Sequence, residues 1–428
     1  MQTSLRAIAL KASKDKQHKF GNLFGLLTVD SLLWCWPFLH KKAAVGVDRI
    51  SAEQYKIHLR ENVSDLAQQV KSKSYHAKLI RRKYIPKSSG KLRPLGIPCL
   101  QDKLLQLAVS KILQAIYEQD FLPCSYGYRP KCGAHDAVKQ LRTSLQSGRY
   151  RYVVEADIRD YFGSIAQDKL LDMLRLRIAD NSFVALLGKW LRAGVLDTDG
   201  QVIHPPTGTP QGAIVSPVLA NVYLHHVLDT WFTQHIIPKC KGQAMLVRYA
   251  DDFVCAFEFR QDAQAFYECL PDRLQEFDLQ LALDKTQIIC FSPALVGQTH
   301  FVFLGFEFRW KATLHGRRCV FTRTAPRKLK SAIANFTSWI KLNRNLRLSV
   351  LFALLNAKLR GYYNYYGLVG NYQRLKSFFQ NVVRLLFKWL NRRSQRKSFN
   401  WQTFGEILVY YKIQRPRIVH KSTSACFP

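Results

Sequence analysis

Two adjacent carboxylates, Asp251 and Asp252, lie inside the apolar and aromatic stretch MLVRYADDFVCAF at residues 245–257. Burying two carboxylates side by side is costly, because their like charges oppose joint ionisation. A third acidic residue, Asp157, has similar surroundings in VVEADIRDYF. Asp is also common in hairpin turns, so the pair by itself is explained equally well by a plain turn.

Three carboxylates that converge in an apolar sheet need cations to neutralise their charges. Mg²⁺ prefers carboxylate and phosphate oxygens as ligands. Two such ions about 4 Å apart can hold the attacking and leaving oxygens of a phosphoryl transfer. The hypothesis is therefore a two-metal site formed by Asp157, Asp251 and Asp252, with Mg²⁺ as the ion and Mn²⁺ as a substitute.

The elements that must position these residues have an α+β pattern. Hydrophobic spacing predicts helices over much of residues 1–75 and an amphipathic helix in DKLLQLAVSKILQAIYEQDF. A basic hairpin is predicted in HAKLIRRKYIPKSSGKLRPLGIP, and a strand running into a turn in RYRYVVEADIRDYFGSI. PPTGTPQGAIVSPVLANVYLHHVLDTWF predicts a loop and a long helix. Residues 244–258 predict two strands folded at ADD, FVFLGFEFRW predicts a strand pair, and helices follow from Pro326 to about residue 400.

The charge of the chain points to a polyanionic partner. The net charge is +34 over 428 residues, and from Lys311 onward there are 24 lysines and arginines but one acidic residue, Glu406. These charges are interleaved with aromatic residues, as in RGYYNYYG, which is typical of a nucleic-acid surface. No apolar run reaches the roughly 18 residues needed to span a bilayer, and no secretory signal is recognisable. We therefore expect a cytoplasmic protein without a membrane partner.

Several motifs together resemble one family. YADD in a short hairpin, preceded in order by ADIRDYF and GTPQGAIVSP, is similar to the palm of a reverse transcriptase. YIPKSSGKLRPLGIP, SYGYRPKCGAHDAV, LALDKTQI and FVFLGFEF extend the resemblance, and KLRGYYNYYG and RLLFKWLNRRSQRKSF carry it to the C-terminal region. The chain thus resembles the bacterial group II intron reverse transcriptase/maturase branch over nearly its whole length.

This resemblance implies a right-hand polymerase fold, with fingers and a palm containing an antiparallel sheet, followed by an all-α basic thumb or maturase domain. The implied domains are an N-terminal helical extension of the fingers (1–75), fingers and palm (76–310), thumb (311–400) and a C-terminal tail (401–428). The implied activity is RNA-directed DNA synthesis by two-metal nucleotidyl transfer. The resemblance also implies that the chain binds its own intron RNA as a maturase. The implied partners are an RNA template, either intron RNA or a dedicated noncoding RNA, a DNA or RNA primer and dNTPs.

The resemblance also implies roles for single residues. Asp157, Asp251 and the backbone carbonyl of Ile158 would bind metal, and Asp252 would shape that site. Phe162, five residues after Asp157, would exclude a ribose 2′-hydroxyl. The other residues expected at the nucleotide are Lys87, Arg93, Gln211 and Lys285, with Arg82 a weaker candidate. The expected primer grip is Phe303, Leu304, Gly305 and Phe306. The basic residues expected to contact nucleic acid are Arg360, Arg384, Lys388, Arg392, Arg393 and Arg396.

Some features depart from the family pattern or leave alternatives open. The ten cysteines show no zinc-binding spacing, and the chain ends about thirty residues after RRSQRKSF, so no DNA endonuclease domain of its own is expected. Ala213 stands where a second glycine is common, and Gly163 where Asp is frequent. The alternatives are a defence-associated reverse transcriptase that copies a dedicated noncoding RNA, and an RNA-binding splicing factor without polymerase activity. An RNA-templated RNA polymerase is opposed by Phe162.

Overall fold

The structure, a computed structural model, describes residues 1–86, 92–313, 315–393 and 398–420. The chain divides into two compact units. Unit 1 comprises Met1–Ala137 and Val153–Ile288, and unit 2 comprises Val138–Tyr152 and Ile289–Pro428. The boundary between the units at residues 288 and 289 comes before the change in charge near residue 310. The units therefore differ from the predicted domains, and those domains stay a proposal.

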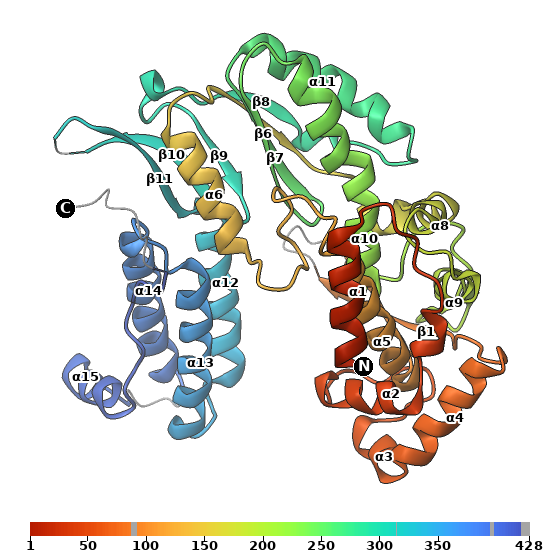
Figure 1. The fold of residues 1–428 in the computed structure, drawn as a ribbon. Coiled ribbons are helices and arrows are strands. Elements are labelled where there is room, and N and C mark those ends of the chain that lie inside the picture. The colour runs from red at the N-terminus through yellow and green to blue at the C-terminus, as the bar shows by residue number, and fades with distance from the viewer. Residues whose placement is uncertain (87–91, 314, 394–397, 421–428) are drawn as a thin grey trace. The chain divides into compact units, whose positions relative to one another are not determined.

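Helices in unit 1 pack around a central helix, α5. The helices of this unit are α1 (Gln2–Lys14), α2 (Val29–Cys35), α3 (Ala52–Ile57), α4 (Leu59–Lys71), α5 (Leu100–Tyr117), α7 (Tyr161–Ser164), α8 (Gln167–Arg175), α9 (Asn181–Leu191), α10 (Ser216–Leu224) and α11 (Arg260–Gln275). Figure 1 shows α1 beside α5, and α2 and α10 also contact α5. The predicted helix is confirmed as α5. The prediction that it is amphipathic is wrong, because 13 of its 18 residues are buried. Neighbours on several sides leave it no wide solvent face.

Two four-stranded sheets position the site in unit 1. The first has the strand order β6-β7-β3-β8 and the second the order β2-β1-β4-β5. The strands are β1 (Ile80–Pro86), β2 (Leu92–Ile97), β3 (Tyr152–Ala156), β4 (Val195–Leu196), β5 (Val202–Ile203), β6 (Ala244–Tyr249), β7 (Asp252–Phe257) and β8 (Gln287–Cys290). The two predicted hairpins, β1–β2 and β6–β7, are confirmed as antiparallel pairs.

The predicted long helix after the Pro/Gly loop changes its geometry part-way. α10 ends at Leu224 and continues as two π-helical segments, His225–Asp229 and Phe232–Ile236. The Thr230 hydroxyl donates to the carbonyl of His225 at 2.7 Å. π-helical turns are rare and often occur at functional sites. Asp229 lies in the first of them.

Unit 2 combines a three-stranded sheet with a helical bundle. Its sheet has the order β11-β10-β9, and the strands and helices are β9 (His300–Phe303), β10 (Phe306–Ala312), β11 (Arg318–Thr324), α12 (Pro326–Asn343), α13 (Leu348–Tyr366), α14 (Tyr372–Leu390) and α15 (Trp401–Tyr410). Most of α6 (Ala134–Gln146) also belongs to it. Figure 1 shows α12, α13 and α14 packed together, and apolar residues from all three and from α15 form one core. None of the helices among the described residues is both long and apolar enough to cross a membrane.

Candidate active site

The turn between β6 and β7 carries Asp251. Tyr249 pairs with Asp252 across the hairpin, which leaves Ala250 and Asp251 as a two-residue turn. Ala250 adopts a φ of 57°, as the tightest hairpin turns require. Asp251 is half-buried; burial raises its pKa, and the negative charge of Asp157 raises it further.

Asp157 directly follows β3, the strand beside β7 in the sheet. The chain around it is held by a bridge between Ile158 and Leu281: the Ala282 amide donates to the Asp157 carbonyl at 2.8 Å. This bridge leads into the 3₁₀ segment Leu283–Lys285, and the Lys285 ammonium donates a hydrogen bond to the Asp157 carboxylate. Two strand ends therefore bring Asp157 and Asp251 together.

The chemistry of Asp157 and Asp251 fits a divalent cation. Their four carboxylate oxygens are hard donors of the kind that Mg²⁺ prefers. The charge of Asp157 is among the causes that raise the pKa of Asp251, so a cation between them would relieve a repulsion that the fold imposes. The Lys285 ammonium neutralises part of this charge, because it pairs with Asp157.

Asp252 occupies a different environment from the other two carboxylates. It is exposed at the start of β7, and its charge contributes to raising the pKa of Lys285 after the larger effects of Asp157. Within the part of the chain that the structure describes, no three His, Cys, Asp or Glu side chains are grouped closely enough to hold a metal. The structure thus pairs two of the three expected carboxylates, and the role of Asp252 stays a prediction.

Phe162, the expected barrier to ribonucleotides, faces an aromatic partner that sequence reasoning missed. Its ring lies 6.3 Å from that of Tyr128, with 79° between the ring planes. Phe162 sits in the short helix α7, which follows Asp160 in a left-handed conformation with a φ of 41°. Tyr128 is 49% exposed although its ring is large and apolar, so the pair presents an aromatic surface beside Asp251.

The loop carrying Tyr128 is fixed to the Asp251 turn. Tyr128 has a φ of 58°, and its neighbour Gly127 approaches Ala250 so closely that a Cβ there would lie 2.3 Å from the Ala250 nitrogen. The Asn221 side-chain amide donates to the Gly127 carbonyl at 2.7 Å. Burial raises the pKa of the Tyr128 hydroxyl, as does the charge of Asp251. The sequence indicated Tyr128 only through the SYGY motif, and that motif does not reveal that Phe162 is its partner.

A buried arginine behind the turn is the second feature that sequence reasoning missed. Arg248 has no exposed surface, and its guanidinium donates to the Ala250 carbonyl at 3.0 Å and to the Asn221 side chain at 3.0 Å. It also donates to the Ser125 hydroxyl at 2.7 Å and pairs with Asp229. Burial by itself would lower the pKa of Arg248, but the Asp229 carboxylate raises it above its ordinary value.

The fingers hairpin contributes Arg93, which the structure describes as exposed on β2. Its charge acts on both Asp251 and Tyr128, lowering the pKa of each against larger opposing effects. Lys87 lies outside the described residues. Arg82 pairs with Gly96 in the register, whereas Arg93 pairs with Ile85. Alternate residues point to opposite faces of a strand, so Arg82 does not share the face of Arg93.

Gln211 lies in the loop before α10, where the chain crosses the fingers strands. Its carbonyl accepts from the Gly96 amide at 2.5 Å. Gly212 has a φ of 109°, and a Cβ there would lie 2.5 Å from the Gly96 carbonyl oxygen, so only glycine permits this approach. The side-chain Oε1 of Gln211 is buried without a hydrogen-bond partner among the described residues.

The expected primer grip is a hairpin of unit 2. Phe303 pairs with Phe306, and Leu304 and Gly305 form the turn, with φ values of 50° and 80°. Both phenylalanines are buried, and the Leu304 carbonyl accepts from the Tyr365 hydroxyl at 2.9 Å. Gly305 is buried as well, so Leu304, which is half-buried, is the one residue of these four with partial access to a ligand.

The expected nucleic-acid residues of unit 2 differ in exposure. Arg360, Arg384, Lys388 and Arg392 are exposed on or after α13 and α14. Arg393 is half-buried and donates to the Leu346 carbonyl at 3.1 Å, which indicates a structural contact. Arg396 lies outside the described residues.

Two family models and several curated relatives match this chain. Residues 85–308 match the family model described as reverse transcriptase (RNA-dependent DNA polymerase), and residues 329–404 match the group II intron, maturase-specific domain. The chain is 31% identical over 323 residues to protein YkfC of Escherichia coli K12, covering 68% of this chain and 83% of that protein. It is 28% identical over 466 residues to the group II intron-encoded protein LtrA of Lactococcus lactis, covering 87% of this chain and 75% of that one.

A solved structure of telomerase from Candida albicans, in complex with a TWJ fragment of telomeric RNA, aligns with 85% of this chain and 66% of that one, at 15% identity and a TM-score of 0.44. The family matches are the stronger finding, because the first alone spans more than half of the chain and contains Asp157, Asp251 and Lys285. The chain therefore belongs to the reverse transcriptases, the RNA-dependent DNA polymerases, and joins that domain to the maturase-specific domain of group II introns.

Proposed function

We propose that Asp157 and Asp251 form the polymerase centre, that the ion they bind is Mg²⁺, and that the RNA copied is intron RNA held by the maturase domain. The observation that supports this proposal most directly is that the two carboxylates converge, one at the end of β3 and one in the β6–β7 turn. Lys285 is hydrogen-bonded to Asp157. Reverse transcriptases generally use divalent metal ions. Mn²⁺ is expected to substitute for Mg²⁺, since both accept hard oxygen ligands.

The residues around the centre have different roles in positioning the metal ions and the nucleotide. Asp157, Asp251 and the Ile158 carbonyl would hold the ions, which when bound would supply activation of the primer 3′-oxygen and stabilisation of the leaving pyrophosphate. Arg93 grips the triphosphate with its planar guanidinium. Gln211 braces the nucleotide, and Phe162 closes the space that a 2′-hydroxyl would need.

Lys285 is proposed to donate a proton to the departing pyrophosphate. The hydrogen bond with Asp157 raises the pKa of Lys285, so its amine carries a proton throughout the physiological range. It is 61% exposed at the side chain, which leaves it free to turn toward a substrate. Metal binding at Asp157 would release it from its present partner.

The maturase domain supports the choice of template. A reverse transcriptase with this domain binds an RNA template, and the exposed Arg360, Arg384, Lys388 and Arg392 supply positive charge along α13 and α14. LtrA, a relative, is an intron-encoded protein. The primer grip at residues 303–306 and the predicted domains complete the proposal. A cytoplasmic location, where RNA and dNTPs are available, is part of it.

The decisive experiment combines primer extension with sequencing of the RNA that co-purifies with the full chain. Asp251→Asn keeps the shape of the side chain but removes its charge, and should lower DNA synthesis on an RNA template more than about 100-fold, since metal ligands contribute several kcal/mol. Asp284→Asn, an exposed carboxylate beside Lys285, is the matched control and should retain activity. Full activity of Asp251→Asn would contradict the proposed centre. Co-purification of a short noncoding RNA in place of intron RNA would contradict the proposed template.

A further inference from the structure

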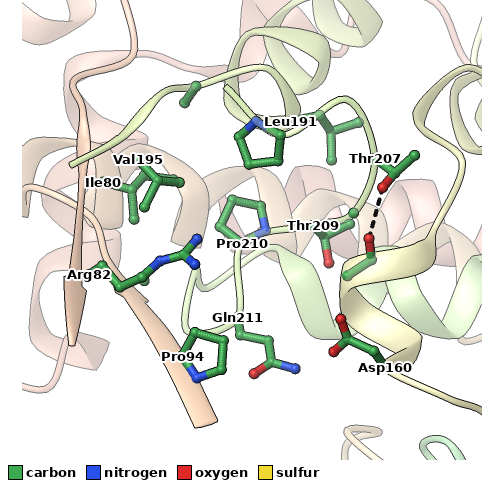
Figure 2. A pocket seen from close by; sticks show the side chains of 15 residues that line it. Ile80, Arg82, Pro94, Asp160, Leu191, Val195, Thr207, Thr209, Pro210 and Gln211 are labelled. Atoms are coloured by element: carbon green, nitrogen blue, oxygen red, sulfur yellow. Dashed lines mark hydrogen bonds between the residues drawn. The ribbon is translucent and has the colours of Figure 1, made fainter. Parts of the chain in front are cut away.

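A pocket of about 180 Å³ lies between the fingers hairpin and the loop that carries Gln211 (Figure 2). Its apolar walls come from β1, β4, the end of α9 and the loop that carries Gln211, and include Ile80, Leu191, Val195 and Pro210. Its polar groups are Arg82, Asp160, Thr209 and Gln211. Ligand pockets for drug-sized molecules measure about 300–1,000 Å³, so this one suits a single ring system and not a whole nucleotide.

Three polar atoms at this pocket are buried without any hydrogen-bond partner in the described part of the chain: Arg82 Nε, Thr209 Oγ1 and Gln211 Oε1. Buried polar atoms are paired in the great majority of cases, because leaving one unpaired costs about 1–3 kcal/mol. One of these atoms is a donor, one an acceptor, and the hydroxyl can act as either. Three such groups around one cavity point to a ligand that pairs with them.

The pocket adjoins the polymerase centre and shares Gln211 with it. Neither Asp157, Asp251, Phe162 nor Arg93 lines it. Arg82 enters it from the strand face opposite that of Arg93. In the view of Figure 2, Arg82 points from β1 into the pocket, and Gln211 lies between Arg82 and Asp160.

The chemistry of the lining favours a neutral, flat ligand over a phosphate. Arg82 is the one cationic side chain among the lining residues described, and Asp160 supplies a negative charge on the other side. Asp160 would repel a phosphate, and a phosphate would make no apolar contact with the walls of the pocket. A nucleobase presents flat faces to apolar walls and an edge of alternating donors and acceptors to polar groups.

We propose that this pocket receives one unpaired base of the RNA template, ahead of the base that is being copied. The inference rests on the proposed function, which places an RNA template at this polymerase. The fingers strands and the Gln211 loop both line the pocket, and a base tethered to bound template would enter at high effective concentration. Arg82 Nε and Gln211 Oε1, two of the atoms without a hydrogen-bond partner among the described residues, would each pair with its edge.

The test scans the template strand with single abasic sites. A primer–template with a single-stranded RNA overhang is bound to the full-length protein without divalent metal or dNTP, and affinity is measured by fluorescence anisotropy. Loss of the base at one overhang position should weaken binding about five- to tenfold, because about two hydrogen bonds are lost. Loss at the other overhang positions should change it less than twofold. 2-Aminopurine at the sensitive position should change its fluorescence on binding.

Variants connect the sensitive position to the pocket. Arg82→Met should remove the position dependence, and Thr209→Val should reduce it without changing charge, which guards against a folding defect in the first variant. Arg81→Met, on the other face of the same strand, should weaken all templates equally and keep the position dependence. A flat abasic scan, or a position dependence that survives both Arg82→Met and Thr209→Val, would overturn the inference. Failure of the proposed function would appear separately, as normal DNA synthesis by Asp251→Asn.

Discussion

Arg248 and Asp229 form an ion pair that solvent does not reach. Both side chains have no exposed surface, and the guanidinium donates to the two carboxylate oxygens at 2.7 and 2.5 Å. The same guanidinium holds the Ala250 carbonyl, so the turn that presents Asp251 is fixed to the π-helical segment His225–Asp229. Breaking such a pair leaves one charge buried and unpaired, which is strongly destabilising.

Asp229→Asn should therefore lower the free energy of unfolding by about 3–5 kcal/mol. The double variant Asp229→Leu, Arg248→Met should lose much less, because no buried charge remains without its partner. Urea unfolding of the wild type, of Asp229→Asn and of the double variant measures the two losses. Equal losses in Asp229→Asn and the double variant would contradict the picture of a compensated pair.

Removing Lys285 should strengthen metal binding, because its ammonium competes with a cation for the Asp157 carboxylate. The side chain is 61% exposed, so the pair is screened and contributes about 0.2–1 kcal/mol. Lys285→Met should lower the Kd for Mn²⁺ by up to about fivefold, measured by electron paramagnetic resonance. Lys285→Arg, which keeps the positive charge, should leave the Kd near that of the wild type. A weaker affinity in Lys285→Met would mean that the lysine supports the metal site.

Phe162→Ala should admit ribonucleotides, because the space for a 2′-hydroxyl opens. The rise in the ribonucleotide to deoxyribonucleotide ratio of kcat/KM should be at least about tenfold. Tyr128→Ala should have a smaller effect of about two- to tenfold, since an edge-on aromatic contact is worth about 0.5–1.5 kcal/mol. Tyr128→Phe keeps the ring and should retain discrimination. Fully additive effects in the Phe162→Ala, Tyr128→Ala variant would show that the two rings act independently.

His225 should make stability fall in mild acid. Burial lowers its pKa from 6.5 to about 4, so the unfolded chain binds a proton in this window that the folded chain does not. Stability from neutral His225 is fully present above pH 6.5 and falls as the pH drops toward 4, by up to about 3 kcal/mol. His225→Phe keeps an aromatic ring beside Phe121 and cannot titrate. The difference in unfolding free energy between wild type and this variant should change between pH 7.5 and 5; a constant difference would contradict the assignment.

RNA affinity should fall steeply with salt, since phosphate contacts release counterions. Lys388→Gln combined with Arg392→Gln should reduce the slope of log K against log salt by about 2, one for each lost contact. Arg393→Gln is the matched control: its guanidinium already donates to the Leu346 carbonyl, so stability should fall while the slope stays nearly unchanged. An unchanged slope in the double variant would remove Lys388 and Arg392 from the RNA surface.

Local patterns in the sequence were sufficient for much of the fold. The apolar and aromatic residues on both sides of ADD predicted the β6–β7 hairpin, and FVFLGFEFRW predicted β9 and β10. Helical spacing after Pro326 predicted α12 to α14. These predictions succeed because the periodicity of apolar residues that marks a strand or a helix depends only on residues close together in the sequence. Asp157, Asp251 and Lys285 were candidates for the same reason, since each lies in a short and specific motif.

What the tertiary structure alone decided depends on contacts between distant residues. Arg248 reaches Ser125 across 123 positions, and Tyr128 meets Phe162 from a separate loop. The burial of α5 on several sides, the exposure of Asp252 and the entry of Arg82 into a pocket follow from how elements pack. The sequence by itself determined which residues are candidates for the chemistry and which elements they end. Their partners were decided only when three-dimensional packing set which side chains lose water and which charges must compensate one another.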